Sequence, residues 1–293
     1  MSDNYLKGIP ASDGISVGPV FYYIPAKLII PVCNAGTVEE EMFRFAAARE
    51  RARVELQGLY EAVERRAGKE EASIFEAHQE MLSDPTLEAK VLEFVEIGLA
   101  AEQALAKAVE ELADLLAGMG EELFASRAQD VRDVGRRVLR ILLGLPDTAL
   151  SAITEPSIIV AEDLTPSDTA SLDPALTLGF VTAQGGLTSH SAILARTLGF
   201  PAIVGTGNDL LEKISSGISI VMDGRTGEVF IEPDKETVAH YLQIKAQRES
   251  QLQILKIAAN RDAHSANGRR VEGAANVGGD GSGRGAGELR AEY

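Results

Sequence analysis

The sequence predicts an α/β domain that is interrupted by an inserted all-α helical bundle. Residues 8–32 are rich in strand-forming residues and are broken by glycine and proline. About a hundred residues with helical spacing of apolar side chains follow, and after Pro146 the pattern returns to alternating strands and helices. Because the early strands are too few to bury an apolar face alone, we expect them to join the later sheet.

The inserted helices begin at a clear signal. Thr37-Val-Glu-Glu40 forms a capping box, and the helix that it opens is expected to end at Gly68. Apolar spacing predicts further helices at about 70–82, 86–97, 101–117 and 122–143. Short connections between such helices are typical of a bundle.

The second half of the chain has the composition of a mixed sheet. Strands are expected at 158–161, 178–182 and 202–205, helices at 166–172 and 191–198, and a hairpin from 218–222 and 228–231. A further helix is expected from Asp234, and the residues after 260 are too rich in glycine to bury much core. The predicted division is therefore an α/β domain of residues 1–35 and 145–232, a bundle of residues 36–144, a linker helix of residues 233–260 and a tail of residues 261–293.

Composition limits the classes of partner. The 28 Lys and Arg residues against 44 Asp and Glu give a net charge of −16, which opposes nucleic acid or an anionic membrane as a partner and favours a basic protein.

The single cysteine, Cys33, excludes an intrachain disulfide and is expected to fill space without a chemical role. Without a signal peptide or an apolar run of about 18 residues, the protein is expected to be cytoplasmic, with no membrane insertion.

The stretch from Gln184 to Arg196 contains the candidate catalytic residue, His190. His190 follows the glycine pair Gly185 and Gly186 and precedes a helix, for which Ser189 is a credible N-cap. Free amides and the positive end of the helix dipole favour an anion at this place. Spacing alone fits equally well with a surface histidine that caps a buried helix.

The motif Gly185-Gly-Leu-Thr-Ser-His-Ser-Ala-Ile-Leu-Ala-Arg196, followed by Pro201-Ala-Ile-Val-Gly-Thr206, resembles the phosphohistidine signature of enzyme I of the bacterial phosphotransferase system, pyruvate phosphate dikinase and phosphoenolpyruvate synthase. Enzyme I is favoured because the resemblance continues at Gly8–Gly18, Ile74–Leu82, Arg127–Arg137 and Asp163–Thr169. The resemblance implies a swivelling phosphohistidine domain whose inserted bundle docks the histidine-containing phosphocarrier protein HPr.

In such a family member His190 would be phosphorylated transiently and would pass the phosphoryl group to a histidine on HPr. The matching family threonine makes Thr169 the candidate partner of the imidazole ring, while the hydroxyls of Thr188 and Ser189 are alternatives that could instead cap the helix. These two residues, with Gly185 and Gly186, would lie near the phosphate.

Arg196 would also lie near the phosphate. It stands nearly two helical turns beyond His190, so either a phosphate contact or an ion pair, structural or facing a partner, fits its position. On the inserted bundle, the resemblance implies a partner-binding surface that includes Glu70, Glu71, His78 and Asp84. An ordinary helix position for His78 and a solvated face for the acids fit the same pattern.

The phosphoenolpyruvate-binding (β/α)₈ barrel of the family is expected to be absent. Residues 270–278 and 287–293 only faintly resemble its beginning, and such a barrel needs about 250 residues. We therefore expect no metal site and no cofactor in this chain, because Mg²⁺ and phosphoenolpyruvate belong to the barrel. Reversible exchange with phospho-HPr is then the expected reaction, and a monomer the expected state, because dimerisation in the family uses the barrel.

Two other interpretations remain open at this level. The chain could be the swivelling domain of a dikinase or synthase relative, which would need a nucleotide-binding partner domain; the inserted bundle argues against this. It could also be a non-catalytic module that binds HPr without exchanging phosphate.

Overall fold

The structure is a computed structural model that describes residues 4–25, 28–32, 34–146, 150 and 152–259. Contacts divide the chain into two units, Met1–Val238 and Ala239–Tyr293. The sheet and the bundle thus belong to one unit, and each unit is described by itself.

The described strands of the first unit form one open, mixed sheet in the order β1-β8-β7-β3-β4-β5-β6-β2. The neighbours from β3 to β6 are parallel, and all other neighbours are antiparallel. The strands are β1 (Tyr5–Lys7), β2 (Ile9–Ser12), β3 (Ile15–Tyr23), β4 (Ser157–Ala161), β5 (Thr177–Thr182), β6 (Ala202–Val204), β7 (Ser219–Asp223) and β8 (Glu228–Ile231). The expected pairing of early and late strands is confirmed, since β1 pairs with β8 and β3 with both β4 and β7.

The two faces of the sheet bury alternate side chains of each strand. On β4, Ile158 and Val160 face one core, whereas Ile159 and Ala161 face the other. The first core is covered by the short helix α8 (Asp209–Lys213). The second is covered by α7 (His190–Leu198), which follows α6 (Pro166–Ala170) in the chain and packs against it.

The inserted bundle lies between β3 and β4 in the sequence. Its helices are α1 (Val38–Ala67), α2 (Lys69–Leu82), α3 (Pro85–Glu96), α4 (Ala101–Ala117) and α5 (Glu122–Leu142). The predicted capping box is present, because the Thr37 side chain accepts from the Glu40 amide while the Glu40 carboxylate accepts from the Thr37 amide. Large, fully buried side chains such as Phe45, Leu56 and Phe75 form the core of the bundle.

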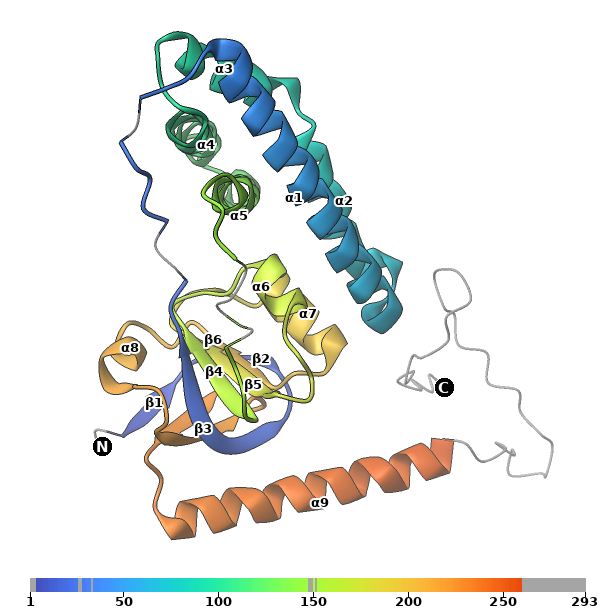
Figure 1. The fold of residues 1–293 in the computed structure, drawn as a ribbon. Coiled ribbons are helices and arrows are strands. Elements are labelled where there is room, and N and C mark those ends of the chain that lie inside the picture. Colours follow the sequence, from blue (N-terminus) through green and yellow to red (C-terminus); the bar gives the residue numbers. More distant parts are fainter. Residues whose placement is uncertain (1–3, 26–27, 33, 147–149, 151, 260–293) are drawn as a thin grey trace, which may run out of the picture. The chain divides into compact units, whose positions relative to one another are not determined.

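Helices α6 and α7 lie between the sheet and the bundle (Figure 1). Ala170 of α6 and Leu194 of α7 belong to the buried core of the bundle. Ala192 and Ala195, on another side of α7, pack onto the sheet. The helix that begins with His190 is therefore held on both sides.

Three sequence expectations need correction. Residues 28–32 are not a strand: they form an extended connection in which Leu28 and Ile30 pack against the bundle, and Pro31 has no amide to donate to a sheet. Helix α8 was not expected. Helix α7 starts at His190 itself, one residue before the predicted start.

Helix α9 (Lys235–Ala259) confirms the helix that the apolar pattern after Asp234 predicts. Its first residues belong to the first unit, and the rest of the helix is the described part of the second unit. The predicted glycine-rich tail at 261–293 lies outside the described residues. Within the described ranges, no helix combines the length and the apolar character needed to cross a membrane.

The buried carboxylate of Glu41, in the first turn of α1, connects this end of α1 to the start of α4. Glu41 accepts a hydrogen bond from the first amide of α4, that of Ala101, at 2.8 Å, and another from the amide of Gly36 at 2.8 Å. Helix α4 needs this contact because its own N-cap residue, Ala100, has no side-chain acceptor. Arg44 pairs with Glu41 at 2.7 Å and also with Glu102.

We predict that Glu41→Ala lowers the free energy of unfolding by about 2–3 kcal/mol, because a charged acceptor is lost and a buried amide is left without a partner. Glu39→Ala, an exposed site in the same helical turn, is the matched control and should have little effect. Urea denaturation followed by circular dichroism measures both variants. Equal stability of the two variants would refute the capping role.

The same contact has a defined pH dependence. Burial raises the pKa of Glu41, but the amides of Ala101 and Gly36 and the charge of Arg44 together lower it more, so the net pKa lies below the usual value. The stabilisation should thus be complete above the unfolded pKa of about 4.3 and should be lost only as pH falls through the lower folded pKa.

Candidate functional site

The site is built on the connection from β5 to α7. Ser189 is the N-cap of α7, because its side chain accepts from the Ala192 amide at 3.3 Å. Gly185 has φ of 97°, a conformation that favours glycine. Gly186 has no heavy atom within 4 Å of the position where a Cβ would lie, so close packing does not require glycine there.

Arg196 stabilises this connection from the last turn of α7. Its guanidinium Nη2 donates to the carbonyl oxygen of Leu187 at 2.6 Å, and its Nε donates to that of Ala192 at 3.2 Å. Of the two roles that the sequence left open for Arg196, the structure shows a structural one, although the pairing is with the backbone and involves no carboxylate. A phosphate contact by this side chain stays a prediction.

His190 is the first residue of α7, and its side chain is 39% exposed. Its Nδ1 lies 4.0 Å from Oδ1 of Asp130, a buried carboxylate on α5 of the bundle. An imidazole whose Nδ1 faces a carboxylate favours the proton on that nitrogen and keeps the lone pair on Nε2.

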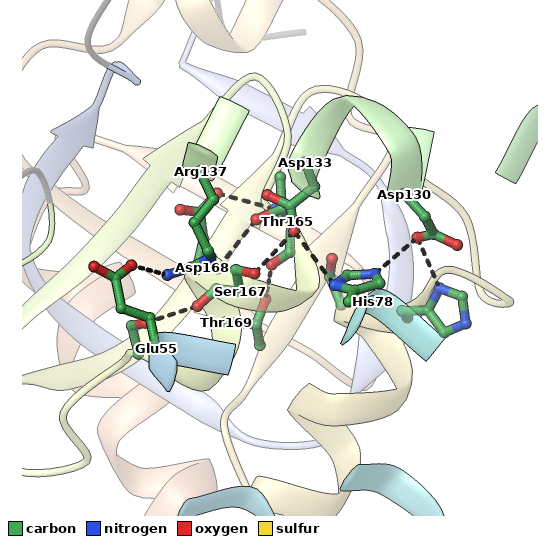
Figure 2. Close-up of polar contacts among 12 residues, drawn as sticks. Glu55, His78, Asp130, Asp133, Arg137, Thr165, Ser167, Asp168 and Thr169 are labelled. Atoms are coloured by element: carbon green, nitrogen blue, oxygen red, sulfur yellow. Dashed lines mark hydrogen bonds and ion pairs between the residues drawn. The ribbon is translucent and has the colours of Figure 1, made fainter. Parts of the chain in front are cut away.

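Asp130 begins a chain of buried polar groups (Figure 2). His78 of α2 lies between two aspartates of α5: its Nε2 is 3.5 Å from Oδ1 of Asp130, and its Nδ1 is 4.0 Å from Oδ2 of Asp133. Ser167 of α6 donates to the same Oδ2 of Asp133 at 2.9 Å. The chain therefore runs from α7, through the bundle, to α6.

Thr169 lies close to this chain but makes another bond. Its hydroxyl donates to the carbonyl oxygen of Thr165 at 3.0 Å, one turn back on α6, and the residue is fully buried. This bond occupies the hydroxyl proton, while the hydroxyl oxygen can still accept from a ring N–H. The role of ring partner for Thr169 stays a prediction, and the structure places the carboxylate of Asp130 opposite Nδ1 instead.

The start of α6 carries another acid, which is half-buried. Asp168 accepts from the Tyr23 hydroxyl at 2.8 Å and from the Thr165 amide at 3.1 Å. Burial raises the pKa of Asp168, and the negative charge of Asp133 raises it further, against the lowering effect of its hydrogen bonds.

The expected partner surface is only partly exposed. Glu70 and Asp84 are exposed, and Glu71 is half-buried and accepts from the Thr197 hydroxyl of α7 at 3.3 Å. His78 has no exposed surface, which favours the ordinary helix position that the sequence also allowed; a partner contact by His78 stays a prediction. It lies on the face of α2 that packs against α5, so protein atoms and not solvent surround it.

Among the residues that the structure describes, His190 belongs neither to a metal-binding cluster nor to the lining of the cavity beside α5 and α6. Among the described residues, no group of three or more His, Cys, Asp or Glu side chains could hold a metal ion. A cavity of about 780 Å³ lies along α5 and α6, and Asp133 and Asp168 line it, but His190 does not.

The sequence reasoning missed Asp130 and Asp133. Both lie in the stretch Arg127–Arg137 and are three residues apart, so a helix places them on one face. That spacing was a usable signal, but only the packing of α2 shows that the face is buried against a histidine.

Comparisons with known proteins agree with this architecture. Residues 7–127 match the family described as "PEP-utilising enzyme, N-terminal", and residues 153–227 match "PEP-utilising enzyme, mobile domain". These two matches place the chain among the phosphoenolpyruvate-utilising enzymes.

More specific relatives are found as well. A phosphoenolpyruvate-protein phosphotransferase of Priestia megaterium is 38% identical over 274 residues, which are 93% of this chain and 48% of the relative. The solution structure of an Enzyme I protein (nEIt) is 40% identical, with a TM-score of 0.66 over 83% of this chain and 99% of that one. The N-terminal domain of a nitrogen-type Enzyme 1 is 26% identical, with a TM-score of 0.54.

The chain belongs to the enzyme I family, the phosphoenolpyruvate-protein phosphotransferases, and matches the amino-terminal part of its members. It spans about half the length of the curated relatives that it matches.

Proposed function

We propose that the chain is a phosphoryl carrier of the phosphoenolpyruvate-dependent sugar phosphotransferase system, in which His190 accepts a phosphoryl group and passes it to a histidine on HPr. The observation that carries this proposal is the placement of His190 at the start of α7, half-exposed, with Nδ1 towards the buried carboxylate of Asp130. This arrangement supports Nε2 as the nucleophile.

The transfer is an exchange of one P–N bond for another when phospho-HPr is the donor. The lone pair of Nε2 on His190 attacks phosphorus as the bond to the donor imidazole breaks, and the donor ring leaves with the bonding electron pair. The attacking ring becomes more positive during this step, and Asp130 next to Nδ1 stabilises that charge. Positioning and electrostatics supply most of the catalysis in such transfers.

The phosphoryl oxygens need donors on the outer side of the ring. The first turn of α7 supplies the positive end of a helix dipole at His190. The exposed Thr188 hydroxyl and the amides of Gly185 and Gly186 are the nearby groups that we assign to the phosphate. Arg196 adds positive charge while it holds the Leu187 carbonyl.

A docking surface for the carrier is available on α5. Leu123, Arg127 and Asp130 are spaced i, i+4 and i+7, so they follow one face of the helix towards His190. Arg127 reaches Asp130 at 3.8 Å, and Leu123 is 63% exposed. Two more exposed apolar side chains precede this helix in the sequence: Leu115 near the end of α4 and Met119 in the connection to α5.

Exposed apolar side chains close to charged ones are typical of a protein–protein interface. The acids at Glu70, Glu71 and Asp84 and the net charge of −16 favour a partner with basic residues around its histidine, such as HPr in this family.

Mg²⁺ does not fit the described residues, because no acidic cluster among them could hold it. The described strands form an open sheet and not a closed barrel. We therefore derive no step through a metal ion, and we propose that phosphoenolpyruvate does not react with this chain by itself.

We predict that incubation with ³²P-labelled phospho-HPr labels the wild-type chain, whereas labelled phosphoenolpyruvate does not. His190→Ala should abolish the label, because the acceptor nitrogen is lost. His240→Ala, at an exposed histidine on α9, is the matched control and should take up label like the wild type. Label that persists in His190→Ala would disprove the assignment, and stable HPr binding without any label would favour a non-catalytic binding module.

We also predict that Leu123→Ala raises the dissociation constant for HPr by about fivefold to tenfold, because the loss of an apolar anchor costs about 1 kcal/mol or more. The control is Val54→Ala on α1, where the side chain is 60% exposed but lies on another helix. Isothermal titration calorimetry measures both values. An equal effect of the two substitutions would contradict the placement of the docking surface.

A further inference from the structure

His78 is an unusual residue for the core of a bundle. It has no exposed surface, and neither ring nitrogen has a hydrogen-bond partner within normal distance in the described structure. The ring also contacts the edge of Phe75 on the same helix, with the centroids 6.0 Å apart. A buried polar group without a partner costs about 1–3 kcal/mol, so packing alone would favour an apolar residue here.

The aspartates on either side explain why an imidazole is present. Asp130 is buried, and its Oδ2 has no hydrogen-bond partner in the described structure; the nearest cation is Arg127, at 3.8 Å. Asp133 is anchored by the hydroxyl of Ser167. A buried carboxylate needs a donor or an opposite charge, and His78 is the group that lies between the two acids.

We propose that His78 is a positioning residue for the transfer: by donating from Nε2 to Asp130, it holds that carboxylate against Nδ1 of His190 and so selects the tautomer with a free Nε2. This inference rests on the proposed function of His190. His78 does not touch the phosphoryl group, and it acts only through Asp130.

The geometry needs only small movements. The separation of 3.5 Å between His78 Nε2 and Asp130 is about half an ångström longer than a normal hydrogen bond. The distance of 4.0 Å between Asp130 and His190 is about 1 Å longer than a normal hydrogen bond, a gap that a rotation of the half-exposed ring can close. Ser167 keeps Asp133 in place on the other side of His78, so the imidazole is limited in how far it can turn away.

Without His78, Asp130 would lose its donor. The carboxylate would then be able to turn towards Arg127, and this change removes the acceptor that faces Nδ1 of His190. More of the His190 ring would then carry its proton on Nε2, the nitrogen that must attack. Loss of an indirect partner of this kind typically costs about 10–100-fold in activity.

The test compares His78→Leu, which removes both ring nitrogens, with His78→Gln, whose amide can still donate to Asp130. Ring ¹⁵N chemical shifts of His190 report its tautomer, rapid-quench labelling by phospho-HPr reports the transfer rate, and calorimetry reports the affinity for HPr. Thermal unfolding confirms that each variant folds. If His78→Leu does not fold, Asp133→Asn replaces it, because it weakens the anchor on the far side of His78 and keeps the shape of the side chain.

We expect His78→Leu to shift the His190 tautomer towards Nε2–H and to slow transfer by about 10–100-fold with unchanged affinity for HPr, and His78→Gln to restore most of both. For Asp133→Asn we expect a change in the same direction but smaller. The proposal would be overturned if the folded variant kept the wild-type tautomer of His190 and the wild-type transfer rate. It would also be overturned if His78→Leu and His78→Gln lost the same amount of transfer rate and both bound HPr more weakly. If the wild type takes no label at all, the proposed function fails, whereas the tautomer measurement still decides whether His78 positions His190.

Discussion

The contact between the first residue of α7 and a buried carboxylate of the inserted bundle is the constraint on which the rest of the site depends. His190 comes from the α/β part of the chain, whereas Asp130 comes from α5. Neither side chain is oriented by its own segment alone. The shared core at Ala170 and Leu194 keeps α6 and α7 against the bundle, and this packing sets the distance between the imidazole and its carboxylate.

This dependence gives the inserted bundle two roles in our account. It offers an exposed apolar face around Leu123 for a partner, and its interior carries the polar chain that reaches the imidazole. Both features lie on α5, so the surface that would receive the carrier and the group that would orient the acceptor belong to one helix. Burying a chain of polar groups costs folding free energy unless each group in the chain has a hydrogen-bond partner.

Much of the fold could be predicted from local signals in the sequence. The capping box at Thr37, the stop at Gly68 and the alternation of strands after Pro146 correspond to backbone preferences that act over a few residues. The position of His190 at a helix start follows from the same kind of signal.

Features that depend on distant segments were not predictable. The segment that contains Leu28 and Ile30 has the composition of a strand, but none of the described strands pairs with it, and the two side chains pack on the bundle. His78 was expected at a surface, and its burial results from the way α2 meets α5. Asp130 and Asp133 look like ordinary charges on an amphipathic helix until the histidines on both sides are placed.

The central claim is that His190 carries the phosphoryl group on Nε2 while Nδ1 keeps its proton towards Asp130. The most direct measurement is a long-range nitrogen–proton correlation spectrum of the ¹⁵N-histidine-labelled chain after phosphorylation by phospho-HPr, with detection of phosphorus–nitrogen coupling. Our account predicts the coupling at Nε2 of His190 and a protonated Nδ1. Coupling at Nδ1, or a phosphohistidine at another position, would contradict it.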